Sequence, residues 1–391
     1  MNKIVSQLLT IILITSFSSF SMAATENKKK KAAPHPDYVK GLTAYENKDF
    51  ATALMLWFPL AESGNPEAQF KVGQMYLDQK GHRKDPAEAA AWIEKAARQN
   101  HVPAQTLLGQ MYLKGVGVKA NYKKSANWLL KAARQKDNEA RYILAKLYYY
   151  GDGVPRSLKK AAYWYKEAAK KNHFESQNSL ALMYLNGDGL KQSDRKAKKW
   201  FEKAANAGNA NAQINLAKLY LNSEKIKQDK AKAFNWFKKA ADQNNAEAQN
   251  KMGEMLDKGE GTKQDRKKAF QWFDKAARQN NIQANYNIGR AYVHGYGTGQ
   301  DFNKAVSHFH KAAEKGHGKA QMDLGVAYYT GKGTVPDSVI AYAWFYVAAA
   351  SNVKDARKTK NALYEKLPTA DKKKAIKLAT EYKREYFVRK R

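Results

Sequence analysis

A period of 36 residues constrains this chain more than any other feature of its sequence. Its clearest marker is a tryptophan column, in which seven copies of a unit have Trp and one copy has His. The members of the column are Trp92, Trp128, Trp164, Trp200, Trp236, Trp272, His308 and Trp344. An Ala-Ala pair follows each member at a fixed offset, beginning with Ala96 and Ala97. Eight copies at one period predict a repeat array, in which each unit packs only against its neighbours.

Each unit has the pattern of two amphipathic helices joined by a loop. In the first copy, a helix predicted over 68–77 places Val72 and Tyr76 on one stripe, and a helix predicted over 86–97 places Trp92 on another. The residue before the second helix can cap a helix N-terminus in all copies: Asp85, Asn121, Ser157, Ser193, Asp229, Asp265, Asp301 and Asp337. The position after it tolerates a left-handed backbone in every copy except at Lys136: Gly64, Asn100, Lys136, Asn172, Gly208, Asn244, Asn280 and Gly316. The sequence therefore predicts an all-α fold.

The loop between the two helices contains Gly-x-Gly in six copies, at 115/117, 151/153, 187/189, 259/261, 295/297 and 331/333. Glycine-rich loops that bind phosphate follow a strand, and the chain has no strand pattern, so we expect these glycines to provide turn geometry. The fifth copy has Ser223-Glu224-Lys225 instead, and the first copy keeps only Gly81. We expect these two loops to differ from the others in shape or mobility.

The N-terminal residues have a different character. Residues 1–23 contain Lys3, a short apolar stretch and the small-residue ending Ser21-Met22-Ala23, which is typical of a secretory signal peptide; an uncleaved membrane anchor is the alternative. Residues 24–37, with four consecutive lysines and two prolines, indicate a basic flexible linker. We therefore expect an exported protein, periplasmic or secreted, without a membrane span after cleavage.

The unit resembles the Sel1-like repeat family, a relative of the tetratricopeptide repeats. The resemblance rests on an Ala-Gln pair at the start of the first helix, a Leu-Gly-x-x-Tyr stretch, the Gly-x-Gly loop, and Ala-x-x-Trp-x-x-x-Ala-Ala in the second helix. It implies a right-handed α/α superhelical solenoid of antiparallel helix pairs. On this basis residues 38–65 form an N-terminal tetratricopeptide-like half-turn, 66–353 form eight repeats of 36 residues, and 354–391 form basic C-terminal capping helices.

The resemblance also implies a function. Exported bacterial members of the family act as adaptors, some in invasion of host cells and some in regulating peptidoglycan-active enzymes. A cysteine-rich branch has been linked to β-lactam binding, but this chain has no cysteine, and that activity is not carried over. We expect a protein–protein interaction scaffold that binds a peptide or protein partner, in the bacterial envelope or in host-cell invasion and virulence.

By similarity to tetratricopeptide repeats, three columns on the predicted first helices line a concave groove, and two of these columns vary widely in chemistry. If stacking does not dictate these residues, they are free to specify a partner or are merely unconstrained. The predicted groove residues are Phe70, Gln74, Gln110, Tyr142, Lys146, Tyr149, Asn178, Lys218, Asn250, Glu254, Tyr286, Arg290 and Tyr329. Their mixture of aromatic, amide and charged side chains suits a peptide better than a small metabolite.

Catalysis and metal binding find little support in the sequence. Four histidines, at 294, 308, 310 and 317, lie close together, but His308 belongs to the tryptophan column and His317 to a turn column, so we predict no metal site. No carboxylate pair at helical spacing and no nucleophile-elbow serine is evident. We expect no catalytic residue and no cofactor.

The net charge of +33 favours anionic partners. These include an acidic protein or, as an alternative function, an anionic glycan, lipopolysaccharide or phosphoinositide surface bound through a basic face. Nucleic acid is not expected, because the repeat places the tryptophans in the core and export removes the usual nucleic acids.

Overall fold

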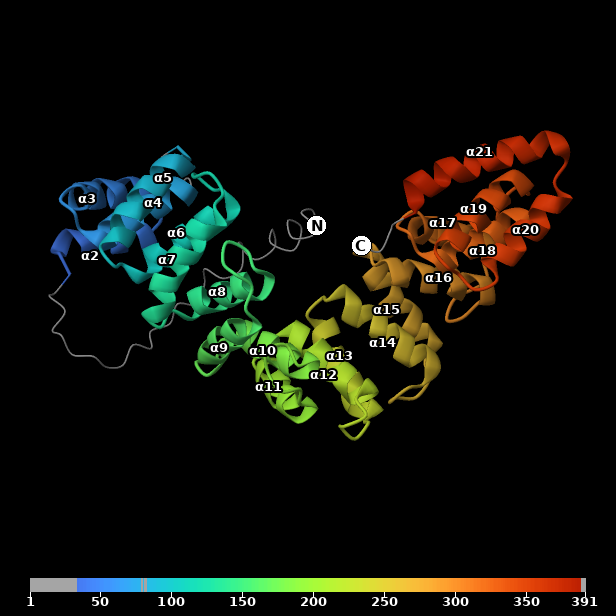
Figure 1. Ribbon diagram of the computed structural model, residues 1–391, viewed down its shortest axis with the longest axis horizontal. Helices are drawn as coiled ribbons and strands as arrows, with labels where there is room; N and C mark the ends of the chain where they lie inside the picture. The colour runs from blue at the N-terminus through green and yellow to red at the C-terminus, as the bar shows by residue number, and fades with distance from the viewer. Residues whose placement is uncertain (1–33, 79, 81–82, 388–391) are drawn as a thin grey trace.

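The computed structural model describes residues 34–78, 80 and 83–387, and its regular structure is entirely helical (Figure 1). The predicted signal peptide, and the predicted linker up to residue 33, lie outside the described residues. The first described helix, α2, begins at Pro36, so the last two residues of the predicted linker are helical. It begins there because proline fits the first turn of a helix and His35 Nδ1 accepts from the backbone N–H of Asp37 at 3.2 Å.

Eight helical hairpins form the body of the molecule, and we number them as repeats one to eight. Their first helices are α4 (Pro66–Asp78), α6 (Val102–Lys114), α8 (Asn138–Tyr150), α10 (Phe174–Asn186), α12 (Ala210–Asn222), α14 (Ala246–Lys258), α16 (Ile282–His294) and α18 (Gly318–Thr330). Their second helices are α5 (Pro86–Arg98), α7 (Tyr122–Arg134), α9 (Leu158–Ala169), α11 (Asp194–Asn206), α13 (Lys230–Asp242), α15 (Arg266–Arg278), α17 (Phe302–Ala313) and α19 (Ser338–Ala350). The hairpin α2–α3 (Pro36–Glu46, Phe50–Glu62) precedes them, and α20 (Ala356–Lys366) and α21 (Thr369–Tyr386) follow.

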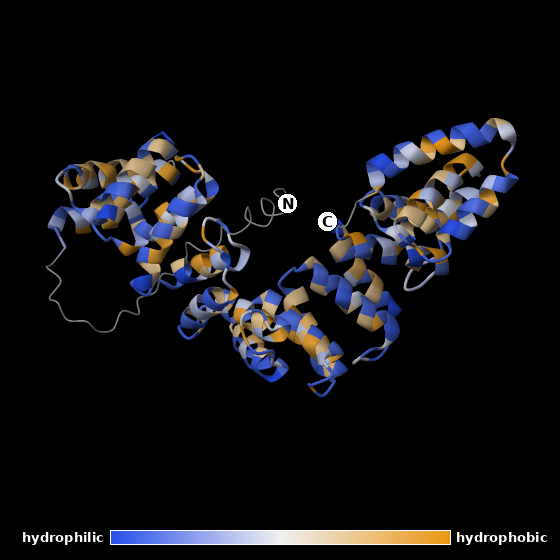
Figure 2. Ribbon diagram, in the orientation of Figure 1, coloured by the Kyte–Doolittle hydropathy of each residue, from blue (hydrophilic) through white to orange (hydrophobic). Residues whose placement is uncertain are grey.

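The hairpins stack in chain order into an elongated, curved array (Figure 1). Hydrophobic residues occur on every hairpin along the array and do not gather at one centre (Figure 2). The buried residues accordingly form clusters that run along the stack, such as the one that extends from Ala145 to Ile288. This is the solenoid predicted from the 36-residue period, since each hairpin buries its apolar faces against its neighbours.

The predicted caps of the second helices are all present. In every repeat, the side chain before the second helix accepts a hydrogen bond from a backbone N–H of its first turn, as Asp229 does from Lys232 at 2.8 Å. The predicted left-handed positions also all have positive φ, including Lys136 at 71°. Lys136 adopts this conformation at a steric cost that Gly or Asn largely avoids.

The second glycine of each Gly-x-Gly loop is required by close packing between repeats. A Cβ atom at Gly153 would lie 2.3 Å from the carbonyl carbon of Tyr122, at the start of the preceding repeat's second helix. The other five second glycines also face preceding backbone, and all twelve glycines of these loops have positive φ. The interpretation as turn geometry is therefore correct. The fifth loop differs as expected, since Ser223 is extended with φ −75° and ψ 129°, whereas residues 79, 81 and 82 of the first loop lie outside the described residues.

A buried amide joins successive repeats and explains the Ala-Gln pair of the sequence motif. Gln213, on α12, donates to the carbonyl of Ala205 at the end of α11 at 3.0 Å and accepts from Gln243, after α13, at 2.9 Å. Equivalent bonds surround Gln105 and Gln249. The amide thus connects three helices, and it must stay polar because its partners are buried backbone carbonyls.

The expectation that the tryptophan column lies in the core is only partly correct. Trp92 and Trp344 are buried, but the five members from Trp128 to Trp272 are half-buried, and lysines such as Lys239 lie over four of their rings. The fully buried column is the next residue along each second helix: Ile93, Leu129, Tyr165, Phe201, Phe237, Phe273, Phe309 and Phe345. These side chains pack on the small residues of the first helices, where a Cβ atom at Gly253 would lie 2.4 Å from the Phe273 ring.

The last two helices close the array at its C-terminal end. Helix α21 lies across α19 (Figure 1), and Trp344 is buried against the rings of Tyr382 and Tyr386, at centroid distances of 4.8 and 5.4 Å. A terminal repeat without such a cover would expose the apolar face that internal repeats bury on one another.

Candidate functional site

The first helices of the repeats form the inner layer of the curved array. Side chains bridge them from one repeat to the next: Asn215 donates to Asn178 at 2.9 Å, and Lys218 pairs with Glu247 at 2.6 Å. Between the second helices of two repeats, hydrogen bonds among the described residues join only the residues that follow these helices, as Gln279 donates to Asn244 at 3.1 Å. A concave surface along this layer requires the first helices of successive repeats to lie closer together than the second helices.

The thirteen predicted groove residues all lie on first helices, but they differ in exposure. Arg290 and Tyr329 are exposed. Asn250 and Tyr286 are buried, with 4% and 8% of their surfaces accessible. The remaining nine are half-buried: Phe70, Gln74, Gln110, Tyr142, Lys146, Tyr149, Asn178, Lys218 and Glu254.

Packing between repeats constrains the column that contains Tyr286, so the prediction that stacking leaves this column free is wrong. Wherever this column has an aromatic residue, the N-cap of the next first helix is histidine, and the two rings are in contact. The pairs are Phe70–His101, Tyr142–His173 and Tyr286–His317, with ring centroids 4.8, 5.2 and 4.4 Å apart. The column therefore varies together with the cap position, and much of its variation serves the junction between repeats.

One of these histidines should make stability depend on pH. His317 Nδ1 accepts from the backbone N–H of Ala320 at 3.1 Å, so capping requires the neutral ring, and burial together with Lys319 lowers the pKa of His317 below its ordinary 6.5. The unfolded chain binds the proton more tightly, so the stabilisation is complete above pH 6.5 and is lost as pH falls through the lower folded-state pKa.

The matched variant for this effect is His317→Asn, because Asn209, Asn245 and Asn281 fill the same position and cap their helices. We expect the unfolding midpoint of the wild type, relative to that of His317→Asn, to fall as the pH is lowered below 6.5, as measured by urea denaturation followed by circular dichroism. A constant difference across this range would contradict the assignment.

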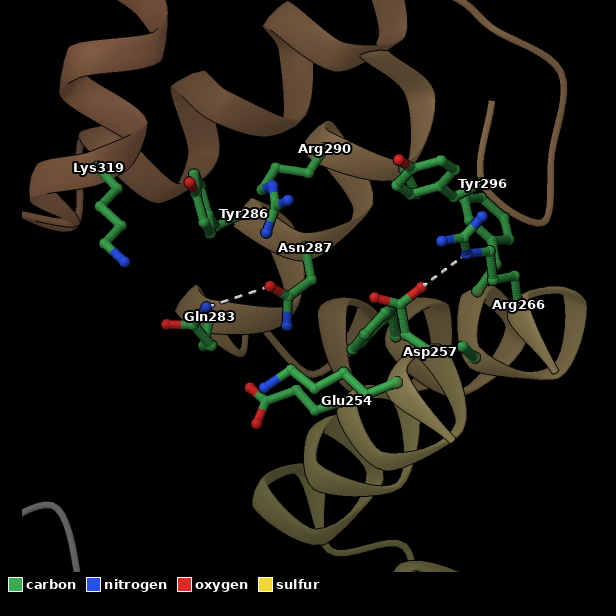
Figure 3. Close-up of a pocket in the computed structure, with 14 residues that line it drawn as sticks. Glu254, Asp257, Arg266, Gln283, Tyr286, Asn287, Arg290, Tyr296 and Lys319 are labelled. Atoms are coloured by element: carbon green, nitrogen blue, oxygen red, sulfur yellow. Dashed lines mark hydrogen bonds and ion pairs between the residues drawn. The ribbon is translucent and has the colours of Figure 1, made fainter. Parts of the chain in front are cut away.

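A cleft of about 280 Å³ lies in the inner layer between repeats six and seven (Figure 3). First helices of three successive repeats contribute to it: α14, α16 and, through Lys319, α18. The predicted residues Glu254, Tyr286 and Arg290 line it, and Phe270 and Phe273 of α15 are also among its lining residues. The other ten predicted residues lie elsewhere along the layer.

The two walls of the cleft differ in charge. On the α14 wall, Glu254 is fixed by Lys251 at 2.6 Å and by Asn250 at 2.8 Å, and Asp257 pairs with Arg266 at 3.5 Å. On the opposite wall, Arg290 and Lys319 have no ion-pair partner among the described residues (Figure 3). The cleft therefore offers two cations that form no ion pair, although both interact electrostatically with the Asp323 carboxyl, beside carboxylates that are already paired.

The floor between these walls is polar and held by hydrogen bonds. Asn287 donates to Asn250 at 3.0 Å and accepts from Gln283 at 3.2 Å. Burial, together with the charge of Asp323, raises the pKa of Tyr286 to about 12, and burial also raises the pKa of the Asp323 carboxyl. The Tyr286 hydroxyl, hydrogen-bonded to Asp323, stays protonated at neutral pH and presents no negative charge to a ligand.

Several residues that line the cleft were not predicted from the sequence. Gln283 and Lys319 belong to a column one turn N-terminal to the predicted ones, and Asn287 to the column beside Tyr286. Both columns also vary in chemistry, so variability alone would have found them. Tyr296 and Arg266 gave no such signal, because the cleft brings together a loop and a second helix.

The described residues contain no group of three or more His, Asp or Glu side chains placed to bind a metal ion. The clustered histidines have separate contacts: His308 with Asn285, His310 with Tyr328 and His317 with Ala320. None of the described helices is both long and apolar enough to span a membrane.

Comparison with known proteins points to one family. The family model of the Sel1 repeat matches eight consecutive segments: residues 66–101, 102–137, 138–173, 174–209, 210–245, 246–281, 282–317 and 318–353. No curated protein matches the chain.

Two solved structures resemble the chain over most of its length. A protective antigen of uropathogenic Escherichia coli, described as having an SLR fold, is 30% identical over 90% of this chain and 84% of its own, with a TM-score of 0.55. A Sel1 repeat protein of Oxalobacter formigenes is 28% identical over 88% of this chain and 98% of its own, with a TM-score of 0.62.

Proposed function

Because the chain belongs to the Sel1 repeat family, whose solenoids generally mediate protein–protein interaction without catalysis, we propose that it is an exported scaffold that binds an extended peptide or protein segment along its inner layer. The cleft between repeats six and seven is the centre of this interface. The proposal rests chiefly on one observation: three successive first helices surround a polar cleft in which Arg290 and Lys319 lack ion-pair partners among the described residues.

The chemistry of the cleft favours an acidic partner segment. A carboxylate of the partner can pair with Arg290 and Lys319, while the amides of Gln283 and Asn287 can bond to its backbone. Glu254 and Asp257 lie on the α14 wall and are already paired, so they repel an acidic group of the partner on that side. This difference between the walls fixes the direction in which the segment binds. Desolvated charges of this kind contribute more to specificity than to raw affinity.

Export and a role in virulence are part of the proposal. The signal-peptide pattern of residues 1–23 supports export to the periplasm or beyond. The similar Escherichia coli protein is a protective antigen of uropathogenic strains, which supports a function in the bacterial envelope or in contact with a host.

Site-specific photocrosslinking in living cells tests the interface. A photoreactive amino acid replaces Gln283, exposed at the cleft, and in a control strain it replaces Gln271, an equally exposed glutamine on the second helix α15. We expect a discrete crosslinked partner from position 283 and none from 271. The same species from both positions would contradict a groove-directed partner.

Charge variants measure how much the cleft contributes. We expect Arg290→Ala/Lys319→Ala to weaken binding of the crosslinked partner about tenfold or more, because each charge-assisted hydrogen bond contributes about 1.5–3 kcal/mol. The control Lys263→Ala/Lys267→Ala removes the same charge from exposed lysines near the start of α15 and should leave affinity unchanged at fixed salt. Equal losses in both pairs would show that only net charge matters.

A second candidate function is binding of an anionic glycan, lipopolysaccharide or phosphoinositide surface through the basic face. The observation that favours it is a basic cleft beside the fifth loop, remote in sequence from the residues of the groove cleft.

A further inference from the structure

The loop of repeat five is built differently from the six loops that the structure describes completely in the other repeats. Lys225 stands where the other seven repeats have the second glycine: Gly81, Gly117, Gly153, Gly189, Gly261, Gly297 and Gly333. In the described loops that glycine lies against the start of the preceding second helix, where a Cβ atom would clash with backbone, as at Gly189 against Leu158. A lysine cannot pack there, so the fifth loop cannot close on α11 in the same way.

A serine hydroxyl holds the fifth loop in its own conformation. Ser223 Oγ donates to the buried carboxylate of Asp194, at the start of α11, at 2.6 Å, and accepts from the backbone N–H groups of Lys225 and Ile226 at 3.1 Å each. The loop is thus fixed to α11 by a polar contact where the other repeats use direct backbone packing.

A cleft of about 530 Å³ lies between this loop and α11, within the range of small-molecule sites. Its lining has six cationic side chains, from Arg195, Lys198, Lys199, Lys225, Lys227 and Lys232, and two carboxylates. Both carboxylates are paired: Glu202 with Lys198 at 3.4 Å, and Asp229 with Lys232 at 3.0 Å. Arg195, Lys199, Lys225 and Lys227 have no ion-pair partner among the described residues, and they leave the cleft with four uncompensated positive charges.

The register of the repeats shows how specific this cluster is. Lysine occupies the columns of Lys198, Lys199 and Lys225 in repeats four and five only; the other repeats have small, apolar or neutral polar residues there. The columns of Arg195, Lys227 and Lys232 are often basic, with Lys159, Lys191 and Lys196 one repeat earlier. The cleft and its extra cations therefore occur together at one place in an otherwise uniform array.

We propose, as an extension of the second candidate function, that this cleft binds a sugar or inositol ring that carries at least two phosphate groups. Four unpaired cations around one concavity repel one another, and a compact anion with several negative charges relieves that repulsion. Phosphate groups accept charge-assisted hydrogen bonds from Arg195 and the lysines, while the half-buried Ile226 offers the less polar contact that a ring requires. The ring can belong to a soluble phosphorylated sugar or to the headgroup of a glycolipid or phosphoinositide.

Isothermal titration with inositol trisphosphate tests the site on the full chain. We expect saturable binding of one equivalent for the wild type and an affinity at least about tenfold lower for Arg195→Ala/Lys227→Ala. The control is Lys159→Ala/Lys191→Ala, which removes the same charge from the same columns one repeat earlier, where the glycine loop closes on the helix. The control should bind like the wild type, and equal losses in both pairs, or no saturable binding, would overturn the proposal.

Vesicles distinguish the two sources of the ligand. Flotation with phosphatidylcholine vesicles, with and without a diphosphorylated lipid A, supports a membrane headgroup if the wild type floats only with lipid A and Arg195→Ala/Lys227→Ala does not. Binding of the trisphosphate without flotation supports a soluble phosphorylated sugar. Flotation that both variant pairs reduce equally would indicate attraction by overall charge and would count against the site. The outcome is independent of the groove, because no residue of this cleft lines the other one.

Discussion

Replacing Gly153 by alanine is expected to destabilise the array by about 3 kcal/mol or more. The residue has φ 70°, and a Cβ atom would lie 2.3 Å from the Tyr122 carbonyl carbon, 2.5 Å from its oxygen and 2.6 Å from the Lys123 nitrogen. All three atoms are backbone at the start of α7, so no side-chain rotation relieves the clash. The loop must move off the preceding repeat, and the contact that it makes there is lost.

Gly208 provides the matched control, because it has φ 93° and a Cβ atom there would meet no neighbouring atom within 4 Å. Gly208→Ala therefore has the strained backbone without the clash and should cost only about 1–2 kcal/mol. Urea denaturation followed by helical circular dichroism measures both changes, and hydrogen exchange in α7 localises the loss to the junction. Equal midpoints for the two variants would refute close packing as the reason for the second glycine.

The loops illustrate what the sequence could predict and what it could not. The repeated glycines predicted positive φ, because only backbone geometry explains glycine at two fixed positions without a strand. The contact that makes the second glycine obligatory joins distant residues, for example Gly153 and Tyr122, and no local pattern reveals it. For the same reason, the substitution at Lys225 predicted a loop of different shape, but the cleft beside α11 became visible only in the structure.

For the groove, the sequence predicted the helices that carry its residues but not the exposure of those residues. Helical periodicity assigned all thirteen predicted residues to the first helices, since the 36-residue register leaves no freedom in which helix each belongs to. Exposure within that layer was not predictable, because it depends on packing at the junction between repeats: Tyr286 packs against His317, which caps the first helix of the next repeat. The cleft also needs Arg266 and Tyr296 from outside the first helices, and no column of the repeat indicated them.

The largest effect of a single side chain is expected at Phe237, not at its neighbour Trp236. Phe237 is completely buried, in the same cluster as Ala217, and Phe237→Ala should lower the free energy of unfolding by about 3–5 kcal/mol. Trp236 is half-buried, and the amine of Lys239 lies 4.1 Å from its ring centroid on the solvent side. Trp236→Ala loses partial burial and one cation–π contact, which together amount to about 1–2 kcal/mol.

Trp344 tests whether the loss of stability follows burial of the side chain or its position in the tryptophan column. It occupies the same column as Trp236 but is 1% exposed, because α21 covers it with Tyr382 and Tyr386. Trp344→Ala should therefore cost about 3–5 kcal/mol, like Phe237→Ala and unlike Trp236→Ala. If all three variants unfolded at the same urea concentration, the tryptophan column would belong to the core throughout. The expected ranking instead means that most tryptophans of the column lie at the edge of the core. The buried residue that follows each of them, such as Phe237, holds the repeats together.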